Sequence, residues 1–301
     1  MNVLREEHRV GIDYLQTVTE LLQRVRTAHP TDGLYQAAEL QWWWRVPRST
    51  DVLPQLFWFD DEGRPAAAVI ASDMNEGSSA LYEDTTLVLI VMPGAASDWV
   101  AHVVERGLAH ISESGISAVE LEVDRADEAV REVLLGHGFS IKSDGMVEAW
   151  LAAERRPKIS PLHEGYRLQT RADTMQHPHH FGIRNARHEE ERLRQTSLYR
   201  PDFDLVAHDR QDDVAGYGLF WFDPVTATGV VEPMRTFDDH QQRGLARHIL
   251  TAGIDLLAEA GAARISIGYE PDNPASGHLY RSVGFEPVKQ TDVFAGQAAH
   301  D

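Results

Sequence analysis

The stretch TFDDHQQRGLARHILTAGIDLL, residues 236–257, decides the fold. A strand-like segment ends at its start, a polar loop follows, and a helix with apolar residues at helical spacing begins at Gly244. The first N–H groups of a helix lack intrahelical partners, and the helix dipole adds partial positive charge there. A diphosphate fits such a site, and Gln241 and Arg243 can donate to its oxygens. Small residues at Gly244 and Ala246 allow close approach of the backbone.

This loop resembles the pyrophosphate loop of the GCN5-related N-acetyltransferase (GNAT) superfamily, which reads Gln or Arg, two residues, Gly, one residue, Gly or Ala. A second motif of that family reads Asn, two residues, Ala or Ser, two residues, Leu-Tyr, three residues, Gly-Phe. The matching positions are Gln241, Gly244 and Ala246 for the loop, and Asn273, Ser276, Leu279, Tyr280, Gly284 and Phe285 for the second motif. The motifs stand in the family's order, and the resemblance covers about residues 163–290. Asp238 and Gln242 replace the proline and first glycine that many members carry.

The resemblance implies that strands 229–235 and 264–269 splay apart and hold the pantetheine arm of acetyl-CoA between them. Main-chain groups of Met234, Arg235 and Thr236 would hold that arm and supply an oxyanion donor to the thioester. The expected diphosphate cradle comprises Gln241, Gln242, Arg243, Gly244, Leu245 and Ala246. Asn273 and Ser276 are further expected cofactor contacts, although N-capping of the next helix is the alternative for Asn273.

An amine acceptor must lose a proton before it attacks, because free alkylamines titrate near ~10.4. Glu232 is the candidate base, since the family often carries its base glutamate on this strand; the alternative is an ion-paired or exposed strand residue. Pro233 predicts a bulge beside it. Tyr280 stands where the family carries the acid that protonates the departing CoA thiolate, and its alternative is an aromatic that packs on the sheet.

The chain repeats one order of elements, which predicts an α/β fold of two tandem GNAT-like domains, each with a mixed sheet. The repeat shows in EAVREVLLGHGF at 128–139 and PASGHLYRSVGF at 274–285. Leu134 replaces Tyr280, Asp127 replaces Asn273, and no pyrophosphate loop precedes them. We therefore expect residues 1–155 to be a degenerate GNAT-like domain that braces the active half or shapes its acceptor pocket. Residues 163–301 would be the catalytic domain, after a linker at about 153–163.

The periodicity of the sequence predicts the individual elements. In the first half we expect helices at 12–28, 35–45 and 97–114, with Ser97 as N-cap, strands at 55–60, 65–72, 85–92 and 118–123, and a last helix ending at 136–139. In the second half we expect strands at 166–171, 205–208, 214–222, 229–235 and 264–269, a helical region at 177–195, and helices at 244–260 and 275–283.

The 301 residues carry a formal net charge of -19, spread over both halves. Nucleic acids and anionic membranes are excluded as expected partners, because basic patches hold both. A small-molecule or peptide amine, possibly cationic, fits better; polyamines, aminoglycoside-like compounds, basic peptide termini and small neutral amines stay open, and the alternative is that the acidity serves solubility. The N-terminus lacks the apolar stretch of a secretory signal, so a cytoplasmic location is expected. There is no cysteine to carry an acyl group. A homo-oligomer is possible.

Three other features are interpreted conservatively. The run Trp42–Trp44 cannot face one way on a helix, so at least one ring is expected to be exposed at an interface or pocket wall, although core packing is the more common explanation. Histidines 177, 179 and 180 lack the carboxylate spacing of a metal site, and no metal is expected. Glutamates 189–191 suggest a solvated helix face. An alternative function is a non-catalytic acyl-CoA sensor or regulatory interaction module, and transfer of a longer acyl group is a third.

Overall fold

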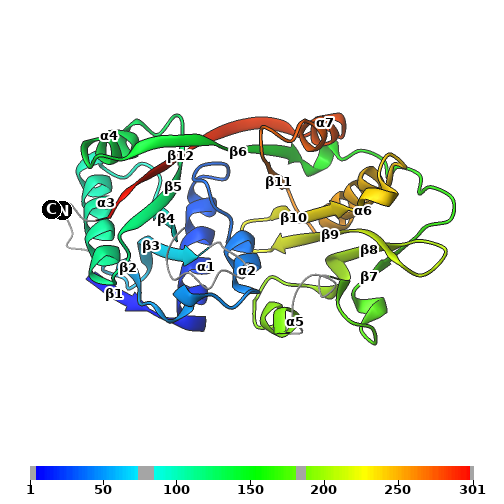
Figure 1. Cartoon of the computed structure of the whole chain (residues 1–301), viewed down its shortest axis with the longest axis horizontal. Coiled ribbons are helices and arrows are strands. Elements are labelled where there is room, and N and C mark those ends of the chain that lie inside the picture. The colour runs from blue at the N-terminus through cyan, green and yellow to red at the C-terminus, as the bar shows by residue number, and fades with distance from the viewer. Residues whose placement is uncertain (1–4, 74–84, 181–187, 299–301) are drawn as a thin grey trace. The chain divides into compact units, whose positions relative to one another are not determined.

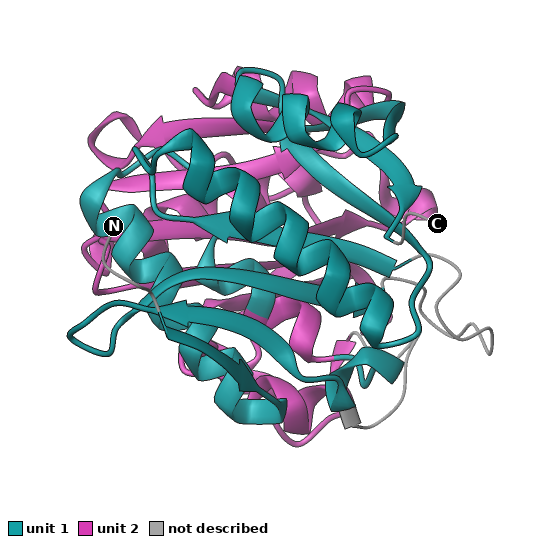
Figure 2. Ribbon diagram, turned by 90° about the vertical axis from the view of Figure 1, so that its left-hand side faces the viewer, with its two compact units in different colours: residues 1–40, 46–146, 289–301 teal, residues 41–45, 147–288 magenta. Residues whose placement is uncertain are grey.

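The structure, a computed structural model, describes residues 5–73, 85–180 and 188–298. By internal contacts the chain divides into two compact units (Figure 2). Unit 1 comprises residues 1–40, 46–146 and 289–301, and unit 2 comprises residues 41–45 and 147–288. The predicted domains 1–155 and 163–301 follow the sequence repeat and stay a prediction. The contact-based units differ from them at segment 41–45 and at the C-terminal strand.

Unit 1 is a sheet with helices packed on it (Figure 1). Its strands follow the order β1-β2-β3-β4-β5-β12. Its elements are β1 (Arg5–Arg9), α1 (Gly11–Ala28), the first half of α2 (Ala37–Trp44), β2 (Gln55–Phe59), β3 (Pro65–Asp73), β4 (Thr85–Val91), α3 (Ser97–Glu113), β5 (Ala118–Asp124), α4 (Glu128–Gly136), the start of β6 (Ser140–Ala152) and most of β12 (Glu286–Gln297). All described pairs are antiparallel except β4 with β5.

Unit 2 has the same pattern of pairing, in the order β6-β11-β10-β9-β8-β7. Its elements are the end of α2, the end of β6, β7 (Arg167–Thr170), α5 (His188–Leu193), β8 (Asp204–His208), β9 (Val214–Asp223), β10 (Thr228–Thr236), α6 (Leu245–Glu259), β11 (Arg264–Tyr269) and α7 (Pro274–Ser282). Here the described parallel pair is β10 with β11. The shared strand topology of the two units confirms the expected tandem α/β fold.

Each unit contains the strand that follows the last helix of the other repeat. The end of β6, which follows α4, pairs antiparallel with β11, and β12, which follows α7, pairs antiparallel with β5. Neither of these strands, nor β1, is predicted from the sequence. Their residues alternate poorly between apolar and polar, as KSDGMVE in β6 illustrates, so periodicity alone gives no signal there.

Helix α6 is held against β9 by close packing at glycine. A Cβ on Gly253 would lie 2.1 Å from the Phe220 ring, and one on Gly218 would lie 2.8 Å from Ile249. Small residues at these positions let the helix approach the sheet, and the buried side chains around it form the core of unit 2. This contact fixes where the N-terminus of α6 lies relative to β10.

The predicted helices and strands agree with the structure to within a few residues, with three corrections. Ala96 rather than Ser97 is the N-cap of α3, and the Asp98 carboxylate accepts the Trp99 N–H. Of the helical region predicted at 177–195, only α5 is an α-helix among the described residues, since Pro178 interrupts its start; residues 181–187 lie outside those residues. Glu189 is buried instead of solvated. No helix of the described chain has the length and apolar character needed to cross a bilayer.

Candidate active site

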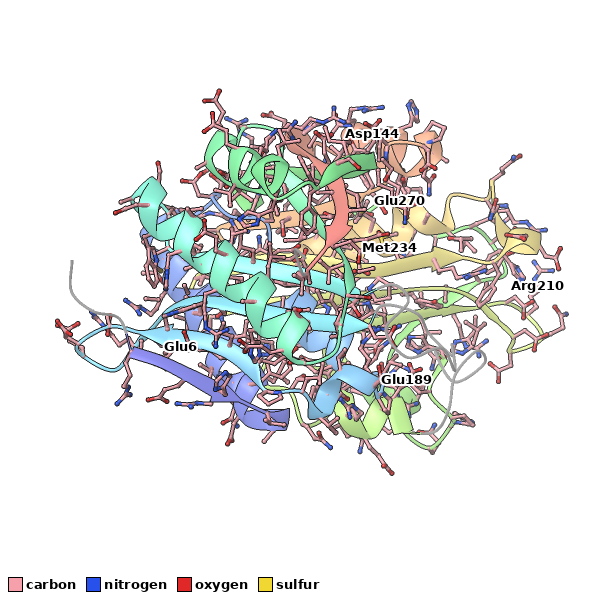
Figure 3. All side chains as sticks on the ribbon, turned by 60° about the vertical axis from the view of Figure 1, so that its left-hand side comes forward. Glu6, Asp144, Glu189, Arg210, Met234 and Glu270 are labelled. Atoms are coloured by element: carbon pink, nitrogen blue, oxygen red, sulfur yellow. The ribbon has the colours of Figure 1, made fainter. Side chains whose placement is uncertain are left out.

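The central strands of unit 2 separate at the expected place. The described ladder between β10 and β11 ends at the pair Val231–Ile267. Strand β10 is bulged against β9 between Val231 and Met234, as Pro233 predicts. Beyond the bulge, Met234, Arg235 and Thr236 pair again with β9. Their opposite edge lies outside the described β10–β11 ladder, which is where the sequence analysis expects main-chain contacts to an acyl thioester. Figure 3 labels Met234 on this strand.

A short 3-10 turn (Asp238–His240) and a polar loop connect β10 to α6. Gly244 is the N-cap of α6 with φ 76°, and Gln242 also has a positive φ of 59°. A Cβ on Gly244 would meet no protein atom within 4 Å, so within the protein the backbone conformation, not crowding, requires glycine. No side chain caps the helix, so its first N–H groups are available to an anion.

The two expected side-chain donors of this loop already have contacts. Gln241 Nε2 donates to Asp238 Oδ1 at 3.0 Å, which braces the loop. Arg243 donates to the Tyr166 hydroxyl, which also contacts His240 Nδ1 at 3.0 Å. Because Arg243 is exposed, its guanidinium adds positive charge at the mouth of the helix start.

Glu232 lies in the bulge, and its side chain is partly buried. Trp221 Nε1 donates to its main-chain oxygen at 2.7 Å. Burial raises the pKa of the Glu232 carboxyl to about 7, although the Arg45 charge and a hydrogen bond from the Trp42 side chain both act to lower it. A carboxyl that titrates near neutral pH can accept a proton and release it again.

Tyr280 lies on α7 and is 9% exposed. Its ring packs edge-on against Tyr269, with centroids 5.7 Å apart. Burial, and then the negative charge of Glu232, raise the pKa of Tyr280 to about 12. The negative charge of Glu232 therefore acts on the Tyr280 hydroxyl, and Tyr280 keeps its proton at neutral pH.

Asn273 adopts the alternative role foreseen for it. Its side-chain oxygen accepts the Ser276 N–H at 3.2 Å and caps α7, while Ser276 Oγ donates back to the Asn273 carbonyl at 2.8 Å. These two residues fix the start of the helix that carries Tyr280. Their contact with a cofactor stays a prediction.

Among the described residues, one group of side chains could ligate a metal ion. It comprises His179, His180 and Asp204, whose potential ligand atoms lie within 4.8 Å of one another. The imidazoles contact opposite oxygens of the Asp204 carboxylate, at 3.0 and 2.9 Å, and the Tyr199 hydroxyl donates to it at 3.0 Å. Two imidazoles and a phenol surround one fully buried carboxylate in a buried polar network, in which burial lowers the pKa of His180. Sequence spacing missed this cluster because Asp204 lies on β8, far along the chain from the histidines.

The Glu232 carboxyl interacts with residues of segment 41–45, which are distant from it in the sequence. Trp42 and Trp44 are each 7% exposed, which is the core-packing alternative, and Trp43 is partly buried. Segment 41–45 packs within unit 2, which accounts for this burial. No local pattern in the sequence could have paired Trp42 with a residue 190 positions away.

Comparison with known proteins agrees with this geometry. Residues 163–285 match the model of the acetyltransferase (GNAT) family. This part of the chain is a GNAT domain. The family model spans the splayed strands, the loop before α6 and the Asn273–Phe285 motif, so the matched region contains the expected catalytic and cofactor-binding residues. The fold of a GNAT domain supports acyl transfer.

Solved structures extend the likeness to both units. A tandem GNAT protein from the clavulanic acid biosynthesis pathway, solved without AcCoA, is 13% identical with a TM-score of 0.68 over 99% of both chains. A GCN5-related N-acetyltransferase from Sphaerobacter thermophilus is also 13% identical, with a TM-score of 0.63 over 99% of this chain and 96% of that one. At this identity the likeness shows the fold, two GNAT-like domains. No curated protein matches the chain by sequence.

Proposed function

We propose that this protein is an N-acetyltransferase that passes the acetyl group of acetyl-CoA directly to an amine in a ternary complex. The observation that carries the proposal is the pairing of Glu232 and Tyr280 beside the separated strands of the GNAT domain. One carboxyl titrates near neutral pH and one phenol keeps its proton, so the site holds a base and an acid at once.

Acetyl-CoA would supply the thioester and lie with its diphosphate at the start of α6. The loop 241–246 would bind it through main-chain N–H groups, and the positive φ at Gly244 sets their direction. The main chain of Met234–Thr236 would hold the pantetheine arm and donate to the thioester oxygen. These roles need no particular side chain on the strand.

The chemistry then requires two proton transfers. Glu232, as carboxylate, takes a proton from the amine, directly or through a water, while the amine nitrogen forms a C–N bond to the acetyl carbon. The C–S bond breaks, and Tyr280 gives its proton to the departing thiolate. Because a free thiol titrates near ~8.5, below a phenol, this transfer is uphill on its own, and proton uptake from solvent by the Tyr280 phenolate completes it. Proton exchange with solvent restores both residues.

The acidity of the chain favours a cationic acceptor, because a net charge of -19 attracts ammonium groups and repels anions. The first repeat has neither a counterpart of Tyr280 nor a pyrophosphate loop, so we place one catalytic site in the chain.

Calorimetric titration with acetyl-CoA and, separately, with CoA tests the proposal first. We expect saturable binding at one site per chain, followed by thiol release when an amine panel is added. Binding at two sites would contradict a degenerate first repeat. Absence of binding at high acetyl-CoA concentration would refute the acetyltransferase.

A further inference from the structure

Segment 41–45 lies in the first repeat of the sequence but packs within unit 2. Its side chains anchor it to the loop that follows α5. Gln41 Nε2 donates to Ser197 Oγ, and Gln41 Oε1 accepts the Leu198 N–H, each at 2.9 Å. The Trp44 indole N–H donates to Gln195 Oε1 at 3.3 Å. Contacts on both sides of Trp42 therefore hold this residue in a fixed position.

Contacts with Trp42 and Glu189 also hold Arg45 in a fixed position. Its guanidinium lies over the Trp42 ring, 3.4 Å from the ring centroid, and its Nε lies 3.4 Å from Glu189 Oε2. Glu189 on α5 is labelled in Figure 3. All three side chains are at least nine-tenths buried. A buried Arg stacked on an indole keeps its charge and loses little freedom when it contacts another group.

Both residues act on the Glu232 carboxylate. The Trp42 side chain hydrogen-bonds to it, and the Arg45 charge attracts it. Two further titratable groups face this arrangement: Tyr280, from α7, and Glu189, which partly neutralises Arg45. Burial favours the neutral acid, whereas Trp42 and Arg45 favour the carboxylate.

We propose that Trp42 and Arg45 are positioning residues for the acetyl-transfer site, holding the Glu232 carboxylate in place and in its proton-accepting form. This inference rests on the proposed function of Glu232. It gives the first repeat a direct task in the reaction, through five residues that fold with the other unit. Neither residue contacts the amine or the thioester in this scheme, so both act through Glu232.

The test compares Arg45→Gln and Trp42→Phe with Arg192→Gln in the full chain. Arg192 is the matched control, because its guanidinium stacks in the same way over Trp44, 3.8 Å from the ring centroid, whereas the Glu232 pKa is shifted by Arg45 and Trp42. The first readout is the pH dependence of kcat/KM for acetyl transfer. The second is the 13C NMR titration of the Glu232 carboxyl, assigned by its loss in Glu232→Gln, which needs no activity.

We expect Arg45→Gln to move the midpoint of both titrations upward by about one pH unit, since a nearby opposite charge lowers a carboxyl pKa by about that much or more. Trp42→Phe should move it in the same direction, and Arg192→Gln should leave it unchanged. Unchanged midpoints in Arg45→Gln, or equal shifts in Arg45→Gln and Arg192→Gln, would overturn the inference. If the carboxyl titration shifts as expected but no amine is acetylated, the inference on Glu232 holds and the proposed function fails.

Discussion

Replacing Glu232 with Gln removes the proposed base while keeping the shape of the side chain. Because the pKa of Glu232 is about 7, close to a tenth of the wild-type enzyme carries the carboxylate at pH 6 and close to nine-tenths at pH 8. We therefore expect kcat/KM to rise about tenfold from pH 6 to its plateau, with a midpoint near 7. Glu232→Gln should lose this dependence and about 10²- to 10⁴-fold of the plateau rate, the usual share of a general base.

The assay is thiol release from acetyl-CoA with an acceptor amine whose own pKa lies below 5, so that only the enzyme titrates. The same substitution carries a stability signature. The pKa of Glu232 in the folded chain lies above its ordinary 4.5. Ionisation of this carboxyl therefore lowers the free energy of unfolding as the pH rises from about 4.5 to 7. Glu232→Gln should thus be more stable than wild type at pH 8, by about 1–3 kcal/mol in urea denaturation. A wild-type midpoint near 4.5, or a fully active Glu232→Gln, would refute the assignment.

Three further outcomes are expected. Tyr280→Phe should lower kcat by about 10²-fold or more while the calorimetric affinity for acetyl-CoA stays unchanged, and an unchanged kcat would exclude Tyr280 as the acid. Gly244→Ala should destabilise the chain by about 1–2 kcal/mol and weaken CoA binding, because φ is 76° there, whereas Gly136→Ala, at an α-helical position, should do neither. Asp204→Asn should lower the free energy of unfolding at pH 7 by about 3–5 kcal/mol. Burial opposes ionisation of Asp204, yet His180 and His179 hold its pKa below the ordinary value, so this contribution should fade as pH falls below about 4 in wild type and be absent in the variant.

The expected site was found in the sequence because its key parts are local. A helix start with Gly244 and the motif from Asn273 to Phe285 each lie within a dozen residues, where chain geometry fixes which groups come together. Pro233 likewise predicts the bulge at Glu232, since a proline cannot donate to the strand ladder. The sequence contains less information on residues whose role depends on the side chains that they contact in the folded chain. Asn273 matched the family motif, yet its side chain caps α7, and Glu189 was interpreted as solvated although it is buried against Arg45.

The sequence by itself determined the repeated α/β pattern, the position of the loop proposed to bind acyl-CoA, and the choice of the candidate acid and base. Only the tertiary structure decided the protonation of that candidate base, because a carboxyl pKa depends on the burial and charges around it, and these come from residues distant in the chain. The same holds for the exchanged strands β6 and β12 and for segment 41–45. Their partners are chosen by packing between distant parts of the chain, and no periodicity within a segment records which sheet it will join.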